Sequence, residues 1–214
     1  MPRIGSETLT RLGPPATVTA MTSTIEPYVK VRRFRRAEYD SLIDLGMFVG
    51  ERLELLDGLL VIREPQGSSH AATVGQIAQM LQAAFGAGWH ARLSAPLALD
   101  AESEPEPDVA IVAGTPRDYL NAHPSTAILV VEVADSSLRL DRRFKAGLYA
   151  RARLPEYWIA NLVDGVLEVH RHHDPTEDAA YGWTYRSVEI LHRAETVTPL
   201  ALPGRMIPVA DLLA

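Results

Sequence analysis

Hydrophobic residues recur at helical spacing along residues 70–85 of the chain. The apolar positions share one face of a helix and indicate one buried side: Val74, Ile77, Leu81 and Phe85. Either Ser68 or Ser69 is expected to cap this helix, because a serine side chain accepts hydrogen bonds from the first free amides. Shorter helices are expected over 36–45 and 142–153, where a glycine or a proline soon follows.

Strand-like segments alternate with these helices. Hairpins are expected around Asp57-Gly58 and Asp164-Gly165, because Asp-Gly favours the two-residue turns that join antiparallel strands. Residues 108–112 and 128–133 are short and almost continuously apolar, which is typical of strands buried on both faces of a sheet. The remaining strands are expected within 89–99 and over 183–191. This order predicts an α/β fold in which helices flank a central mixed β-sheet with extra β-hairpins.

The 214 residues are sufficient for one well-buried domain. Residues 1–26 are rich in Thr, Pro and Gly without periodicity, so we expect a flexible leader followed by a single domain over 27–214. The absence of cysteine excludes disulfides, thiolate metal sites and cysteine nucleophiles. No apolar run approaches the roughly 20 residues that span a bilayer, and the start lacks a signal-like apolar core. A cytoplasmic protein without a membrane segment is therefore expected.

Acidic residues outnumber basic ones, and nearly all of the basic residues are arginine. The net charge of −6 argues mildly against a protein that coats nucleic acid by electrostatics alone. Lysine occurs only at positions 30 and 145, against 19 arginines. A lysine retained in such a sequence indicates a place where a compact ammonium cannot be replaced by a planar guanidinium. Lys145 lies in the middle of the chain's most informative motif, whereas Lys30 lies in a basic entry segment.

Two carboxylates lie within apolar strand segments, where charges rarely occur. Glu132 stands in AILVVEV, and Asp108 opens the apolar run that follows Pro107. If the two strands are neighbours, the carboxylates repel one another unless a cation lies between them. Oxygen ligands without cysteine favour Mg²⁺ or Mn²⁺ over zinc. Lys145, on the following helix, can position a metal-bound water and stabilise charge on a phosphoryl group.

Structural interpretations compete with this chemistry. Glu132 could be a buried ion-pair partner of an arginine, and Asp108 a residue that starts a strand. Lys145 could pair with Asp141 on a solvated helix face. Glu54, which alternates with leucines in a hairpin, could point to solvent. His70 fits a polar residue at the start of a helix. The histidines at 170, 172 and 173 fit a solvated strand end better than a metal site.

The order of these groups resembles that of the PD-(D/E)XK nuclease superfamily. The surrounding sequence is similar to one branch of it, the Uma-two family of restriction endonucleases. Six segments in the family's order carry the similarity: RLELLDGLL (52–60), SSH (68–70), PEPDVAIV (105–112), LVVEVADSS (129–137), DRRFKAGLYA (141–150) and LPEYWIANL (154–162). The similarity extends over residues 30–210, most of the chain.

The resemblance implies a restriction-endonuclease-like fold, a homodimer, and a metal held by Asp108 and Glu132 with Glu54 as an accessory acid. The superfamily's lysine two residues after the glutamate is absent, because Ala134 stands there. In this branch the resemblance implies that the lysine comes from the helix, here Lys145. The loop after Glu132 also differs, since it reads ADSS where relatives tend to have a proline.

The sequence therefore predicts a magnesium-dependent endonuclease that cleaves DNA. A non-catalytic or partner-regulated nucleic-acid-binding module of the same fold stays open, as does a nuclease associated with mobile elements. The acidic net charge and the displaced lysine favour these alternatives slightly. Convergence of the three side chains in an open cleft rimmed by arginine would favour catalysis. A cleft filled by arginine or apolar side chains would favour the binding module.

Overall fold

The computed structural model describes residues 31–213. The leader expected over residues 1–26 lies outside the described residues. Contacts within the chain separate Met1–Arg32 from one compact unit, Arg33–Ala214, which contains every element described below. In the part of the chain that is described, no helix combines the length and the apolar character that crossing a bilayer requires.

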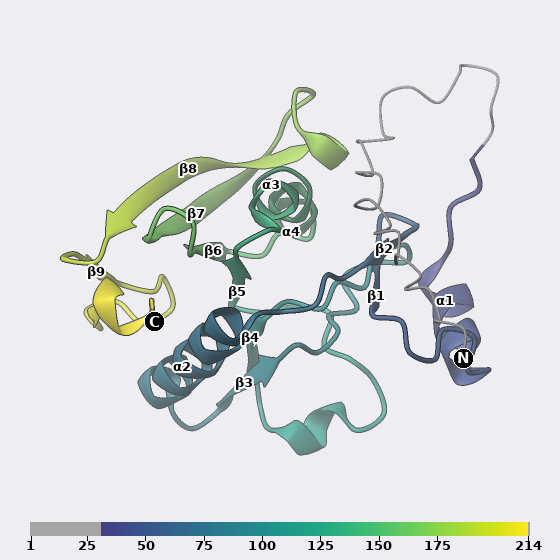
Figure 1. The fold of residues 1–214 in the computed structure, drawn as a ribbon, viewed down its shortest axis with the longest axis horizontal. Helices are drawn as coiled ribbons and strands as arrows, with labels where there is room; N and C mark the ends of the chain where they lie inside the picture. The colour runs from purple at the N-terminus through teal and green to yellow at the C-terminus, as the bar shows by residue number, and fades with distance from the viewer. Residues whose placement is uncertain (1–30, 214) are drawn as a thin grey trace, which may run out of the picture. The chain divides into compact units, whose positions relative to one another are not determined.

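A six-stranded mixed β-sheet forms the centre of this unit (Figure 1). Its strand order is β3-β4-β5-β6-β7-β8, and only β5 and β6 run parallel to each other. The strands are β3 (Trp89–Leu93), β4 (Val109–Ala113), β5 (Leu129–Ala134), β6 (Glu156–Asn161), β7 (Val166–Pro175) and β8 (Trp183–His192). The hairpin expected around Asp164-Gly165 joins β6 to β7. The predicted mixed sheet is confirmed.

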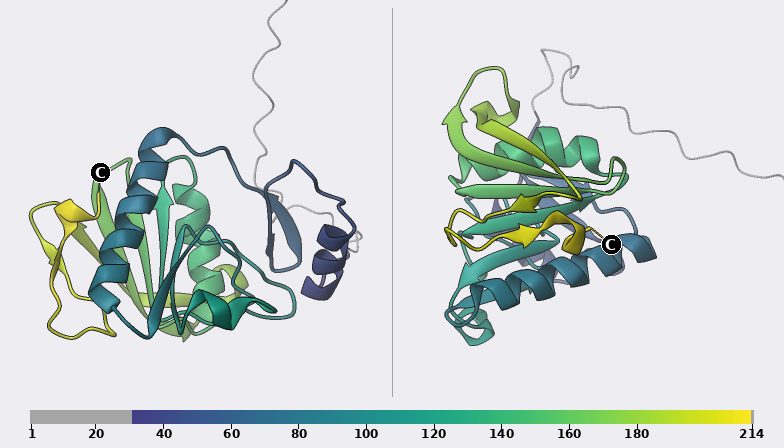
Figure 2. Two further views of the ribbon diagram at one scale, coloured as in Figure 1. Left: turned by 90° about the horizontal axis from the view of Figure 1, so that it is seen from below. Right: turned by 90° about the vertical axis from the view of Figure 1, so that its left-hand side faces the viewer.

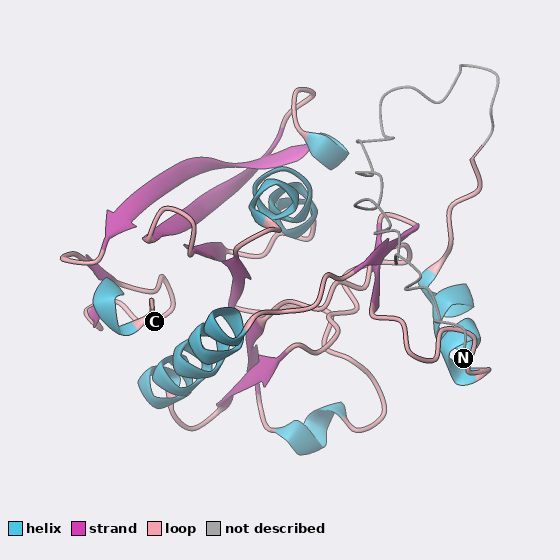
Figure 3. Cartoon of the chain, in the orientation of Figure 1, coloured by secondary structure: helices cyan, strands magenta, loops and turns pink. Residues whose placement is uncertain are grey.

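Helices cover both faces of the sheet (Figures 2 and 3). On one face lies α2 (Ser68–Phe85), and on the other a continuous helical segment made of α3 (Leu138–Leu140), η2 (Asp141–Lys145) and α4 (Ala146–Arg151). Alternation along β5 divides its side chains between two buried clusters. Val131 packs in the cluster of α2, and Val130 in the cluster of α4. By the same alternation, Glu132 is on the α4 side.

A smaller layer packs beside the sheet. It consists of α1 (Arg36–Asp44) and a hairpin of β1 (Leu53–Leu56) and β2 (Leu59–Ile62), which close a small apolar cluster around Leu55. Leu55 also forms a β-bridge with Glu104, so the hairpin is attached to the loop before β4. The remaining short elements are η1 (Pro116–Tyr119), η3 (Ala180–Gly182), β9 (Thr196–Val197), β10 (Ile207–Pro208) and η4 (Val209–Asp211).

Three local details differ from the sequence-based prediction. The N-cap of α2 is Gly67, so neither Ser68 nor Ser69 caps that helix. The strand signal over 89–99 yields only β3, because Ser94 takes a positive φ of 41° and ends the extended backbone. The helix expected from residue 142 begins at Leu138 and contains a π-helical turn, η2, before α4.

Candidate active site

Asp108 and Glu132 face each other across two neighbouring strands. Val109 pairs with Val131 in the antiparallel ladder of β4 and β5, so Asp108, one step further, lies opposite Glu132. The Val133 amide donates to Oδ2 of Asp108 at 2.9 Å, and the Asp108 amide lies 3.4 Å from Oε2 of Glu132. Both acidic residues are 2% exposed. Asp108 directly precedes β4 and Glu132 lies on β5, so the prediction that their two strands are sheet neighbours is confirmed.

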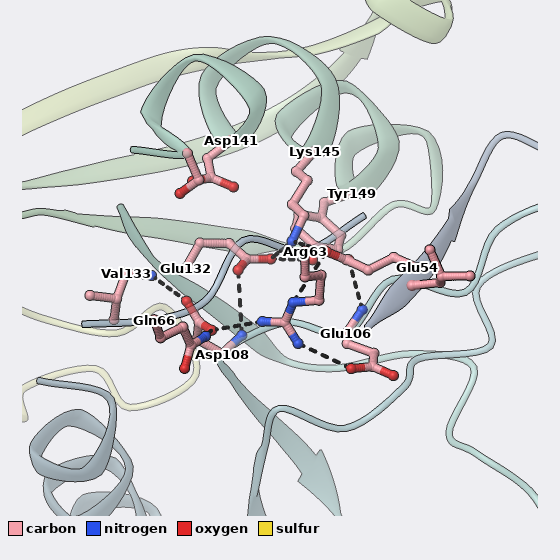
Figure 4. Close-up of polar contacts among 12 residues, drawn as sticks. Glu54, Arg63, Gln66, Glu106, Asp108, Glu132, Val133, Asp141, Lys145 and Tyr149 are labelled. Carbon is pink, nitrogen blue, oxygen red and sulfur yellow. Dashed lines mark hydrogen bonds and ion pairs between the residues drawn. The ribbon is translucent and has the colours of Figure 1, made fainter. Parts of the chain in front are cut away.

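Lys145 and Tyr149 reach Glu132 from the helix above the sheet (Figure 4). Nζ of Lys145 lies 3.0 Å from Oε1 of Glu132 and 3.1 Å from Oε1 of Glu54. The Tyr149 hydroxyl donates to the same Oε1 of Glu132 at 2.7 Å. The four-residue spacing of the lysine and tyrosine puts both on one helix face. Lys145 is thus buried between two carboxylates and does not lie on a solvated helix face.

A π-helical turn lies in the part of this helix that carries its buried polar groups. Asp141 and Lys145 begin and end η2 and are its two buried residues. Oδ2 of Asp141 accepts a hydrogen bond from Ser137 at 2.6 Å. Single π turns inside α-helices occur frequently at functional sites. Asp141 therefore lies at the wall of the same cleft as Lys145 and Asp108.

Arg63 lies at the centre of the remaining contacts (Figure 4). Its guanidinium is 3.0 Å from Oδ1 of Asp108, 3.0 Å from Oε2 of Glu106 and 3.5 Å from Oε1 of Glu54. Gln66 donates to the same Oδ1 of Asp108 at 3.0 Å. The Glu106 amide donates to Oε2 of Glu54 at 3.0 Å. Glu54 is therefore buried in the site and does not point to solvent.

His70 approaches from the first turn of α2. Its Nε2 lies 3.2 Å from Oδ2 of Asp108, while its buried Nδ1 has no hydrogen-bond partner among the residues that the structure describes. The helix start was expected to be polar without a role in the site, yet it supplies this contact. By contrast, His170 packs against the rings of Tyr157 and Tyr185, and neither it nor its neighbours line the cleft.

A cleft of about 340 Å³ is lined by Glu54, Arg63, Gln66, His70, Asp108, Glu132, Asp141 and Lys145, among others. Among the described residues that line it, two are permanent cations, Arg63 and Lys145. Against them stand six carboxylates: Glu54, Glu64, Asp108, Glu132, Asp135 and Asp141. An excess of negative charge in a partly buried space favours uptake of a further cation.

The electrostatics of the buried groups agree with this excess. Burial raises the pKa of Glu132 above its usual range, with a further contribution from Asp108, although Lys145 acts in the opposite direction. Burial alone would lower the pKa of Lys145, but Glu132 and Glu54 outweigh it and raise that pKa. Burial would likewise raise the pKa of Asp108, but hydrogen bonds from His70 and the Val133 amide hold it below the ordinary value.

The donor set fits a hard divalent cation. Magnesium is usually held by one or two protein carboxylates, with water and phosphate oxygens completing its octahedron. Asp108 and Glu132 supply two such carboxylates in the lining of the cleft. Among residues 31–213, no three acidic, histidine or cysteine side chains are already gathered in a geometry that could enclose a metal.

Sequence reasoning did not identify Arg63 and Tyr149, although signals for both existed. The Asp57-Gly58 turn pairs Glu54 with Val61, which makes Arg63 the diagonal neighbour of Glu54 on the same hairpin face. Tyr149 stands four residues after Lys145, on the same helix face. Gln66 gave no such signal, because it lies in an irregular loop.

The chain is similar to known proteins in both sequence and fold. The family model described as "Uma2: Putative restriction endonuclease" matches residues 36–210. The fold is similar to the solved structure of "a putative nuclease belonging to DUF820 from Anabaena variabilis ATCC 29413". The TM-score is 0.59 at 13% identity, over 80% of this chain and 96% of that one, which shows a shared fold. Comparison with curated proteins gave no match.

Proposed function

The chain belongs to the Uma2 family, and from this premise we propose that it is a divalent-metal-dependent nuclease that hydrolyses phosphodiester bonds in DNA. One observation carries the proposal. Asp108 and Glu132 lie opposite each other in an acidic cleft, each in contact with the backbone of the other's strand, and Nζ of Lys145 lies 3.0 Å from Oε1 of the glutamate. Two carboxylates, a lysine and a metal suffice for this reaction class. The family description and the similar fold of a protein described as a nuclease support the same reading.

Asp108 and Glu132 are the residues that would hold Mg²⁺ or Mn²⁺, with Glu54 as an accessory acid. When bound there, the ion would polarise a phosphoryl oxygen and lower the pKa of a bound water. Glu54 forms ion pairs with Lys145 and Arg63, and it thereby helps to hold both side chains in position in the site. Because the cleft is acidic, the metal also offsets the repulsion that the phosphate backbone would otherwise meet.

Lys145 has two tasks in this proposal. An ammonium carries three donors, and contacts with Glu132 and Glu54 occupy two of them. The third is available to hold the attacking water or to stabilise charge that develops on the phosphoryl oxygens. The first two contacts, together with the Tyr149 hydroxyl, hold Oε1 of Glu132 and leave Oε2 facing Asp108. Tyr149 is therefore a positioning residue for the glutamate.

One observation favours a second candidate, a DNA-binding module without catalysis. The guanidinium of Arg63 is inserted among the carboxylates and occupies an oxygen of Asp108. A cleft whose acids are already neutralised by arginine has less need for a metal. The same family and fold would then serve binding alone. The two candidates differ in one measurable property, hydrolysis that depends on an added divalent ion.

The test is incubation of supercoiled plasmid with the purified full chain in Mg²⁺, in Mn²⁺ or in EDTA. Matched variants Asp108→Asn and Glu132→Gln remove charge at the site with little change in volume. Metal-dependent nicking by the wild type that both variants lose supports the nuclease. Plasmid retardation without nicking under all conditions supports the binding module. Nicking that both variants retain contradicts the proposed site.

A further inference from the structure

Arg63 forms a set of contacts that the proposed mechanism leaves unexplained. One guanidinium touches three carboxylates, those of Asp108, Glu106 and Glu54, and its side chain is only 8% exposed. A guanidinium is a planar fork of five donors that matches carboxylate and phosphate oxygens equally well. Its position therefore suits a phosphate as well as the acids that it now contacts.

The contact with Asp108 conflicts with the proposed metal site. Oδ1 of Asp108 accepts from both Arg63 and Gln66, and Oδ2 accepts from the Val133 amide beside His70. No carboxylate oxygen of Asp108 is therefore free of donors. A divalent ion at Asp108 would also lie close to the fixed positive charge of the guanidinium, and like charges repel. Metal binding thus requires Arg63 to release Asp108.

The other two contacts allow that release without expelling the guanidinium. Glu106 and Glu54 bind separate parts of it, and both remain when the contact with Asp108 is broken. Arg63 directly follows β2 and precedes the loop 64–67, whose residues also line the cleft. The side chain is therefore attached to a hairpin at its base, while its guanidinium lies among the carboxylates of the cleft.

We infer that Arg63 is a phosphate-binding residue of the reaction, held on Asp108 until a substrate phosphate replaces that carboxylate as its partner. This inference rests on the proposed function. It gives Arg63 two opposed effects: it weakens metal binding in the free protein and strengthens binding of the phosphodiester. By linkage, the phosphodiester and the metal then favour each other's binding. Arg63→Gln, which removes the charge, should change the two affinities in opposite directions.

The experiment measures both affinities for the wild type, Arg63→Gln and Arg117→Gln, an exposed arginine outside the cleft that serves as the control. Calorimetry with Mn²⁺ alone gives the metal affinity. Fluorescence anisotropy with a labelled duplex, whose phosphorothioate linkages resist hydrolysis, gives the substrate affinity in saturating Mn²⁺. Arg63→Gln should bind Mn²⁺ roughly 10- to 100-fold more tightly, the range expected when a charged hydrogen bond no longer competes. It should bind the duplex on the order of 10-fold more weakly.

Unchanged or weaker Mn²⁺ binding by Arg63→Gln overturns the inference, as does unchanged duplex binding. If Mn²⁺ binds equally to both proteins but not to Asp108→Asn, the metal site stands and only the inference fails. If Mn²⁺ binds to neither protein, the inference and the metal in the proposed function fail together. Arg63→Lys covers the case in which Arg63→Gln does not fold. It keeps the charge without the fork, so it should retain the metal affinity of the wild type and lose several-fold in duplex affinity.

Discussion

Asp108 and Glu132 each hold the backbone of the other's strand. Oδ2 of Asp108 accepts from the amide that follows Glu132, and Oε2 of Glu132 lies 3.4 Å from the amide of Asp108. This reciprocal arrangement fixes the relative position of the two carboxylates through the sheet itself. A site built on strands is positioned more accurately than one on loops. Substitutions of the side chains in this site should therefore leave the backbone in place, so differences in activity between variants can be attributed to the side chains.

Replacement of Lys145 is the most direct test of the mechanism. Lys145→Ala and Lys145→Arg should each reduce Mg²⁺-dependent cleavage by roughly 10²- to 10³-fold, because the water or phosphate loses its ammonium. Sequence reasoning alone favours intact folding of both variants. Burial of Lys145 between two carboxylates changes that expectation: Lys145→Ala should also lose about 3–5 kcal/mol of stability, since it leaves unpaired buried charges.

Cleavage rates and thermal melting curves measured in parallel separate the two effects of the lysine variants. Lys30→Arg is the control, because position 30 is the other lysine of the chain. Rates near those of the wild type for a folded Lys145→Ala protein would remove the lysine from the mechanism.

Tyr149→Phe tests the positioning of Glu132. The change keeps the buried ring and removes the hydroxyl that donates to Oε1 at 2.7 Å. We expect a loss of about 1.5–3 kcal/mol of stability, as for hydrogen bonds to charged groups, and a cleavage rate lower by about tenfold. Tyr185→Phe is a matched control, because that buried hydroxyl donates at 2.9 Å to the Leu154 carbonyl, away from the cleft. Equal cleavage by both variants would contradict the role of Tyr149.

Glu104 should make stability fall as pH rises. Burial, with a smaller contribution from Asp40, raises its pKa from 4.5 to about 7, although Arg36 opposes this. Between these values the folded protein retains a proton that the unfolded chain has released, so the free energy of unfolding decreases with pH. Glu104→Gln cannot ionise and should be more stable than the wild type at pH 8 by about 1–3 kcal/mol.

Urea denaturation at pH 4 and pH 8 measures the effect of Glu104, and the difference between the two proteins should vanish at the lower pH. The exposed Glu51→Gln serves as the reference substitution. A Glu104→Gln protein with the same pH dependence as the wild type would show that this carboxylate does not control it.

The chain should form a homodimer. Cutting both strands of a duplex usually needs two sites related by two-fold symmetry, and two-fold dimers are the commonest assemblies. Light scattering at micromolar concentration should give twice the mass of a single chain, which is 23.5 kDa. A mass of one chain at every concentration would exclude the dimer in solution. Nicking of one strand at a time would then be the expected mode of cleavage.

The sequence predicted the parts of the site that follow from regular structure. Asp108 and Glu132 could be placed together because each interrupts an apolar run typical of a central strand. Lys145 could be singled out because it is one of two lysines in an arginine-rich sequence and lies on the helix that follows Glu132. The two contacts of its ammonium could not be derived, because they depend on how the hairpin that carries Glu54 docks beside the sheet. Long-range docking of this kind leaves no periodic signal in a sequence.

The fold was predicted well wherever alternation or helical spacing was strong, as in β5 and α2. It was less accurate where local backbone geometry decides the outcome. Ser94 ends β3 through a positive φ, which is uncommon for residues other than glycine and has no compositional signal. The π turn η2 also has no signal in the sequence, since its residues are equally suited to an ordinary α-helix.

That turn has a consequence for how the gene can vary. A π turn holds one residue more than an α turn, so removal of one codon within 141–145 would let the segment close as a regular α-helix whose two flanks keep their faces. The residues within the turn, which begins at Asp141 and ends at Lys145, would then no longer point in their present directions. Loss of one residue here should therefore give a protein that folds but is inactive, whereas an exposed loop would tolerate the same loss.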